Sequence, residues 1–151
     1  MKRITAALAM ACSTLVVPAA QAANDAECAA EWTSADANKD GVLAGPEANR
    51  YLAYIRIRAQ VAPEDGRITQ ERFLEACRGG TFKAQDPEPG APLKGANSFT
   101  EGQARDRALA AGFADVSPLT KDGDGIWRGT GKKGDREVAV AVDYKGNVVS
   151  Q

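Results

Sequence analysis

The stretch DANKDGVLAGPE, residues 36–47, places oxygen-bearing side chains at alternate positions and closes on a glutamate. The candidate metal ligands are the side chains of Asp36, Asn38, Asp40 and Glu47 and the backbone carbonyl of Val42. Oxygens at alternate positions can all point inward from a chain that wraps an ion, and hard cations such as Ca²⁺ prefer oxygen ligands. The chemistry that these residues could perform is therefore the binding of a hard cation in a short loop.

The residues around these ligands fit a loop between two helices. Gly41, at the sixth position, allows a sharp bend at low steric cost. Pro46 suits the first turn of an outgoing helix, PEANRYLAYIRIRAQ, on which Tyr51, Leu52 and Ile55 recur at amphipathic spacing. The alternative interpretation is a solvated turn of Asp, Asn and Gly residues that binds no ion.

With Trp32 on the incoming helix and Leu43 between polar neighbours, this segment strongly resembles an EF-hand. The resemblance implies a calcium ion clamped by both carboxylate oxygens of Glu47, with a water molecule acting in place of a ligand at Ala44. Secreted EF-hands can also bind lanthanides, but the lanthanide-selective family usually has proline at the second loop position. Ala37 stands there in this chain, so calcium is the expected ion and a lanthanide is the alternative.

An altered copy of the loop follows in EDGRITQERF, residues 64–73. When this copy is aligned on Gly66, the first and third ligand positions are Val61 and Pro63, and the closing glutamate has become Arg72. Two side-chain oxygens are absent and a cation replaces the bidentate carboxylate. We therefore expect that this second loop does not hold calcium.

The degenerate loop can still support the intact one. In paired hands, the apolar residue after the seventh position joins a short antiparallel ladder between the loops, so the resemblance places Leu43 beside Ile68. Arg72 could replace the ion with an ion pair. The sequence thus predicts that residues 25–77 form an all-α hand pair in which the first loop binds the ion and the second braces it.

Cys28 and Cys77 lie in helical-looking segments at the two ends of this unit. They are the cysteines left if the N-terminal segment is removed, and an even number in an exported protein favours a disulfide. A bond across about 50 residues would stabilise so small a unit by roughly 4 kcal/mol, through the entropy of the unfolded chain. The alternative is a pair of buried free thiols.

Residues 1–22 are typical of a secretory signal peptide. Lys2 and Arg3 precede an apolar, alanine-rich run, and the small-residue pattern AQA of residues 20–22 predicts cleavage at its end. A membrane anchor is an alternative that the short run of small residues disfavours. Lipidation at Cys12 is another alternative, although no leucine stands three positions before it. We therefore expect a periplasmic or secreted protein without a membrane span.

Charge and composition exclude several classes of function. Without Lys2 and Arg3, 17 basic side chains (19 minus 2) stand against 20 acidic ones, a net charge near −3. Nucleic acids and anionic membranes need a basic face, so neither is an expected partner. The chain has no histidine, which excludes histidine triads, histidine metal sites and histidine pH switches. Without a nucleophile and its base, no enzyme is expected.

The chain changes character after the hand pair. Residues 78–98 hold four glycines and three prolines without apolar periodicity, which predicts a flexible, partly extended linker. Beyond it, Thr100 and Gln103 form a capping box for a helix that stops at Gly112. The linker therefore predicts two separately folding units, residues 25–77 and residues 99–151.

The rest of the chain alternates as an antiparallel sheet does. The expected strands are DVSPL (115–119), GIWRGTG (125–131), EVAVAVDY (137–144) and NVVSQ (147–151), the first at an edge because it contains a proline. In the third strand Val138, Val140 and Val142 face one way. They would pack beneath the helix together with Trp127 and Phe113.

This order of helix and hairpins, with an aromatic–glycine helix end and the ending VDYKGNVV, resembles the PepSY family of small exported domains over residues 99–151. Members of that family are linked to peptidase inhibition or to peptidase propeptides, and no catalytic residue comes with the resemblance. The residues alone predict a small α+β binding module. The whole chain is thus expected to be α+β, with an all-α hand pair linked to a helix on three or four antiparallel strands.

The leading interpretation is an exported calcium-binding protein that acts as a sensor, a buffer or a calcium-stabilised binding module, with a periplasmic protein or a peptidase as its partner. The alternative is a PepSY-type peptidase inhibitor or chaperone-like module in which the ion is structural. Asp122 and Asp124 also have metal-like spacing in TKDGDGIW. No acid stands at the twelfth place, Gly131, so a hairpin turn is the favoured interpretation there.

Overall fold

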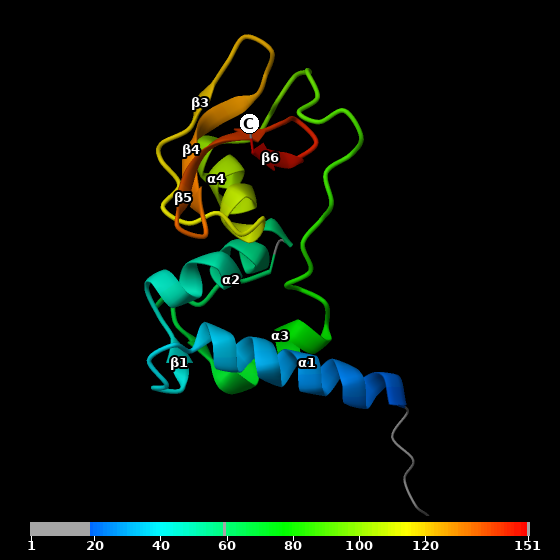
Figure 1. The fold of residues 1–151 in the computed structure, drawn as a ribbon, viewed down its shortest axis with the longest axis vertical. Coiled ribbons are helices and arrows are strands. Elements are labelled where there is room, and N and C mark those ends of the chain that lie inside the picture. The colour runs from blue at the N-terminus through cyan, green and yellow to red at the C-terminus, as the bar shows by residue number, and fades with distance from the viewer. Residues whose placement is uncertain (1–18, 59, 151) are drawn as a thin grey trace, which may run out of the picture.

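The structure, a computed structural model, describes residues 19–58 and 60–150. Within these residues the chain forms four helices, a two-stranded sheet and a four-stranded antiparallel sheet, so the fold is α+β as expected. Three of the helices gather with the small sheet in one unit, and the fourth lies with the larger sheet in a second unit (Figure 1).

The first unit consists of two helix–loop–helix segments that share their middle helix. Its elements are α1 (Ala19–Ala35), β1 (Val42–Leu43), α2 (Pro46–Ile57), β2 (Ile68–Thr69) and α3 (Gln70–Arg78). The strands β1 and β2 are antiparallel, and Leu43 lies opposite Ile68 as predicted. This short ladder holds the first loop (residues 36–47) beside the second loop (residues 61–72).

The core of the first unit is largely aromatic. Phe73 is fully buried and lies edge-on to Trp32 and Tyr51, with ring centroids 5.3 and 4.8 Å apart. Phe82, which follows α3, lies 4.9 Å from Phe73. Such pairs contribute about 0.5–1.5 kcal/mol each beyond the burial of their area. The cluster therefore fixes α1, α2 and α3 against one another, and with them the two loops.

A disulfide joins Cys28 of α1 to Cys77 of α3, which confirms the predicted pairing. The two Cα atoms are 5.8 Å apart, a usual separation for a disulfide. Beside it, Arg78 forms an ion pair with Asp25 at an N–O distance of 2.6 Å. The disulfide and the ion pair tie α1 to the C-terminal end of α3.

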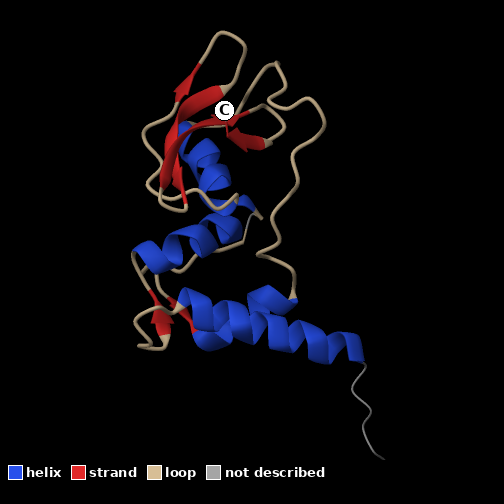
Figure 2. Cartoon of the chain, viewed as in Figure 1, coloured by secondary structure: helices blue, strands red, loops and turns tan. Residues whose placement is uncertain are grey.

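The second unit is a helix packed on a four-stranded sheet (Figure 2). Its elements are α4 (Glu101–Ala110), β3 (Thr120–Lys121), β4 (Trp127–Lys133), β5 (Arg136–Val142) and β6 (Val148–Ser150), with sheet order β3-β4-β5-β6. The capping box of Thr100 and Gln103 begins α4 as predicted. Val140 and Val142 pack with Phe113 in the core beneath this helix. The expected position of the valine-rich strand is confirmed.

The prediction of an edge strand at residues 115–119 is wrong. The edge strand is β3, which begins at Thr120 and pairs with Trp127 and Arg128 of β4. Asp115 has a left-handed backbone (φ 47°), and Pro118 has no N–H to donate to a ladder. The segment therefore follows β4 through isolated contacts, such as the hydrogen bond from the Ser117 amide to the Thr130 carbonyl, 2.9 Å long.

The linker, residues 78–98, contacts both units. Phe82 is buried in the aromatic core of the first unit. The amide of Leu93 donates a 2.9 Å hydrogen bond to the buried carboxylate of Asp143 in the second unit. The amide of Gly95 donates to the carbonyl of Asp124, and at Gly125 a Cβ would collide with the Gly95 carbonyl. Beyond Arg78, which ends α3, the linker is thus irregular but is attached to both units at several points.

The two units also meet directly through α2 and α4. Arg56 of α2 forms a bidentate ion pair with Asp106 of α4, at N–O distances of 2.7 and 2.5 Å. Ala110 of α4 belongs to the core of the first unit. Residues 51–55 of α2 are all buried, although consecutive residues of a helix point to different sides. They are buried because the rest of the first unit covers one side of α2 and α4 covers another. The separate folding of the two units stays a prediction.

The predicted signal peptide lies mostly outside the described residues, since residues 1–18 are not described. Export therefore stays a prediction. Among the helices of the described residues, none has the length and apolar character needed to cross a membrane.

Candidate metal centre

The first loop begins at the last turn of α1 and ends on the first turn of α2. The Asp36 amide still donates a helical hydrogen bond to the Trp32 carbonyl, so the first candidate ligand is fixed by α1. Pro46 begins α2, and Glu47 therefore sits in the first turn of that helix. The two ends of the ligand series are thereby held by rigid elements rather than by the loop itself.

The side chain of Asp36 organises the bend of the first loop. It is buried, and its two carboxylate oxygens accept the amides of Asp40 and Gly41 at 3.2 and 3.1 Å. Gly41 has a left-handed backbone (φ 81°), which suits the sharp bend that the sequence predicted at the sixth position. Lys39 is also left-handed (φ 60°), which is uncommon for a residue other than glycine. The loop is therefore held in a tight curl.

Glu47 reaches back across the loop to its beginning. One carboxylate oxygen accepts the backbone amides of Ala37 and Asn38 at 3.1 and 3.2 Å. The other accepts the side-chain amide of Asn38 at 3.5 Å, and the same amide nitrogen lies 3.3 Å from Asp40. The four predicted side-chain ligands are thus brought into one hydrogen-bonded cluster, although they span twelve positions of the loop.

The amide of Asn38 occupies the middle of this cluster. Its nitrogen faces the carboxylates of Asp40 and Glu47, while its oxygen accepts the Asp40 backbone amide at 2.9 Å. A rotation of the amide group by half a turn would exchange its donor for its acceptor. Val42, the fifth predicted ligand through its carbonyl, follows at β1, and its amide donates to Asp40 at 2.9 Å.

In the described part of the chain, no group of three or more His, Cys, Asp or Glu side chains is arranged so that it could hold a metal ion as it stands. In the first loop the oxygens of Asp36 and Glu47 accept backbone N–H groups. The set of three carboxylates, one amide and one backbone carbonyl nevertheless fits the chemistry of a hard cation such as Ca²⁺.

The second loop is closed by its arginine. The guanidinium of Arg72 donates a 2.7 Å hydrogen bond to the backbone carbonyl of Val61, which joins the twelfth position to the first. The sequence suggested an ion pair here, and the observed partner is a carbonyl oxygen. As in the first loop, the carboxylate at the fifth position, Asp65, accepts the amide two residues later, at 3.1 Å. The two loops share a curl, but the second is closed by a side-chain cation.

The Asp122 and Asp124 turn has the bonding of a hairpin turn. Asp122 accepts the amides of Asp124 and Ile126, both at 2.9 Å, and pairs with Arg128 at 2.6 Å. The hydrogen bond from Arg128, followed by that from the Ile126 amide, lowers the pKa of Asp122. Asp124 pairs with Lys94 of the linker at 3.0 Å. Both carboxylates are therefore engaged by cations of the chain.

Two groups in the structure were not identified from the sequence. Asp143 is completely buried and accepts amides from the linker and from its own turn. The spacing of Asp143, Gly146 and Asn147 in DYKGN is the local signal of a side-chain-stabilised turn. The second group is Arg107, whose surroundings depend on residues distant in the sequence and give no local signal.

Comparison of the chain with protein-family models, with curated proteins and with solved structures found no match.

Proposed function

We propose that this protein binds one calcium ion per chain in its first loop and that its second loop braces the first without an ion. The observation that carries the proposal is the hydrogen-bonded cluster that unites Asp36, Asn38, Asp40 and Glu47 at the end of α1 and the start of α2. The helix–loop–helix pair and its Leu43–Ile68 ladder support an EF-hand pair.

The expected affinity is modest. Three carboxylates with one amide form a ligand set of low charge, and Lys39 within the loop weakens the field. We therefore place the dissociation constant in the weaker range of calcium loops, roughly 10⁻⁵ to 10⁻³ M.

The second loop contributes no ion in this account. Arg72 already links the ends of that loop, and Val61 and Pro63 supply no side-chain oxygen. Replacing Arg72 with alanine should therefore leave the stoichiometry at one ion per chain. Binding in the first loop should weaken only through the loss of the brace.

The choice of ion is tested by calorimetric titration of the oxidised protein with Ca²⁺, Mg²⁺ and a lanthanide. Calcium should bind at one site and magnesium should bind more weakly, because Mg²⁺ demands a tighter octahedral shell and loses its waters reluctantly. A lanthanide that binds many orders more tightly than calcium would favour the alternative ion. No heat of binding with any of the three would refute the proposal.

The second unit is proposed to be a PepSY-like module that meets a periplasmic protein or a peptidase after export. Its support is the order α4-β3-β4-β5-β6, which matches the helix-and-hairpin order that carries the resemblance. Inhibition of a panel of periplasmic peptidases by the protein would favour an inhibitory role. Calcium binding without any such inhibition would favour a sensor or a buffer.

A further inference from the structure

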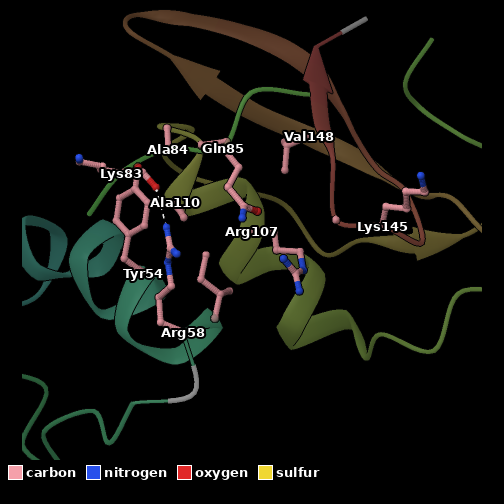
Figure 3. Close-up of a pocket in the computed structure, with 12 residues that line it drawn as sticks. Tyr54, Arg58, Lys83, Ala84, Gln85, Arg107, Ala110, Lys145 and Val148 are labelled. Carbon is pink, nitrogen blue, oxygen red and sulfur yellow. Dashed lines mark hydrogen bonds between the residues drawn. The ribbon is translucent and has the colours of Figure 1, made fainter. Parts of the chain in front are cut away.

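A cavity of about 350 Å³ lies where the two units meet (Figure 3). Its walls come from the C-terminal ends of α2 and α4, from the linker, and from the β5–β6 turn together with the start of β6. No residue of the first loop lines it, so this cavity is separate from the proposed calcium site.

The charged residues that line the cavity are all cationic. They are Arg58, Lys83, Arg107 and Lys145. The amino groups of the two lysines are directed away from the cavity in Figure 3, and that of Lys145 pairs with Glu88 at 2.7 Å. The positive charge of the cavity itself therefore comes from the two guanidinium groups, one on α2 and one on α4.

Arg107 is held rigidly at the cavity wall. Its guanidinium carbon lies 4.3 Å from the centre of the Phe99 ring, and a Cβ at Gly146 would come within 2.6 Å of one of its terminal nitrogens. Its Nε atom is buried and has no hydrogen-bond partner among the described residues. Burial lowers the pKa of Arg107, against the opposing effect of the Asp143 carboxylate. A buried donor without a partner is costly, so the positive charge of Arg107 is only partly compensated within the chain.

The helix ends beside the cavity offset only part of this charge. A helix C-terminus carries roughly half a negative charge, and a cation placed there is stabilising for that reason alone. Arg58 is the C-cap of α2 and Arg107 lies in the last turn of α4. Two full positive charges exceed two half charges, and the buried carboxylate of Asp143 offsets a further part of the charge on Arg107. Arg58 moreover donates to the Lys83 carbonyl of the linker at 3.2 Å rather than to a helix carbonyl.

Apolar side chains supply another part of the wall. It includes Tyr54, Ile57, Ala110 and Val148, and the amide of Gln85 reaches in from the linker (Figure 3). A planar guanidinium matches a carboxylate through two parallel hydrogen bonds, whereas the apolar wall favours a hydrocarbon group next to that carboxylate. We propose that this cavity binds a carboxylate attached to an apolar group, with Arg107 as its principal anchor and Arg58 as its second cation.

The proposal is tested by NMR titration of the oxidised ¹⁵N-labelled protein with N-acetyl-leucyl-leucine, its C-terminal amide, and octanoate. The free carboxylates should shift the amide signals of Arg107 and Gly146 saturably, with a dissociation constant at or below about 10 mM. The peptide amide should bind at least tenfold more weakly than the peptide acid. Tighter binding of the peptide would identify a peptide C-terminus as the source of the carboxylate, and tighter binding of octanoate would identify a fatty acid.

A matched pair of variants locates the anchor. Arg107→Gln should weaken binding of the better carboxylate at least tenfold, while Arg105→Gln, an exposed arginine of the same helix outside the cavity, should change it less than twofold. Equal losses in both variants would overturn the proposal, as would an absence of saturable shifts or equal binding of acid and amide. If Arg107→Gln does not fold, the comparison of acid and amide on the unaltered protein still decides the question.

Discussion

Reduction of the Cys28–Cys77 disulfide removes a cross-link without removing a carbon or sulfur atom from the core. The bond joins residues 49 positions apart, and the chain-entropy relation gives about 4 kcal/mol of stabilisation for a loop of that length. This is roughly a thousandfold change in the unfolding equilibrium, since each 1.4 kcal/mol is about a factor of ten. For a chain of this size, we expect the midpoint of thermal unfolding to fall on the order of 15 °C.

The assay is urea unfolding followed by tryptophan fluorescence, with and without a phosphine reductant. With a slope of about 2 kcal/mol per molar urea, the midpoint should fall by roughly 2 M on reduction. The slope itself should rise, because the reduced unfolded chain is less compact and exposes more surface. Alkylation before reduction should label neither Cys28 nor Cys77. Equal midpoints for the two forms would refute the cross-link argument, and two alkylatable thiols would refute the pairing itself.

Three further predictions address the packing and the charges. Burial acts to raise the pKa of Asp143, but hydrogen bonds from the amide of Leu93 and from Asn147 and Lys145 lower it overall. The stabilising contribution of the ionised Asp143 is therefore complete above the ordinary carboxyl pKa and is lost as the pH falls through the lower pKa of the folded state. The loss of unfolding free energy in Asp143→Asn, measured by urea unfolding, should thus shrink below about pH 4. A loss that is independent of pH would contradict this. Asp106→Asn breaks a partly exposed pair with Arg56 and should cost only about 0.5–1 kcal/mol, which chemical unfolding at low and high salt can measure. Phe73→Ala empties the centre of the aromatic core and should cost about 3–5 kcal/mol in the same assay, whereas a loss under 1 kcal/mol would show that the core had been misjudged.

Local patterns predicted much of the first unit. The positions of Asp36, Gly41 and Glu47 follow from spacing alone, because each loop position has its own backbone and ligand requirement. The register of Leu43 with Ile68 follows from aligning two copies of the same loop. The Thr100–Gln103 capping box is likewise local, since both of its hydrogen bonds are made within one helical turn.

Contacts between distant segments were beyond these patterns. The glycines and prolines of the linker indicate an irregular backbone, but they do not reveal that Phe82 enters the aromatic core or that Leu93 binds Asp143. The packing of α2 on α4 depends on which faces remain uncovered once each unit has formed. The edge-strand error at residues 115–119 has a simpler cause, because alternation of side chains does not reveal the left-handed backbone of Asp115.

The surroundings of the candidate ligands were also only partly predictable. The sequence identified Asn38 as an oxygen ligand, whereas the structure turns its amide nitrogen toward Asp40 and Glu47. Likewise, Arg72 was predicted to substitute for the ion, but its partner, the carbonyl of Val61, was not predicted. In both cases the hydrogen-bond partner is chosen by geometry across the loop, which spacing does not specify.

The most direct test of the central proposal is the calcium stoichiometry and affinity of the unaltered protein compared with Glu47→Gln and Glu64→Gln. Glu47 closes the first loop, whereas Glu64 is an exposed carboxylate of the second loop, so the two changes remove the same charge from different loops. We predict that the unaltered protein and Glu64→Gln each bind one ion with similar affinity. In Glu47→Gln, binding should weaken at least a hundredfold, because the bidentate carboxylate is lost. Two ions per chain, or unaltered affinity in Glu47→Gln, would contradict the assignment of the first loop as the calcium site.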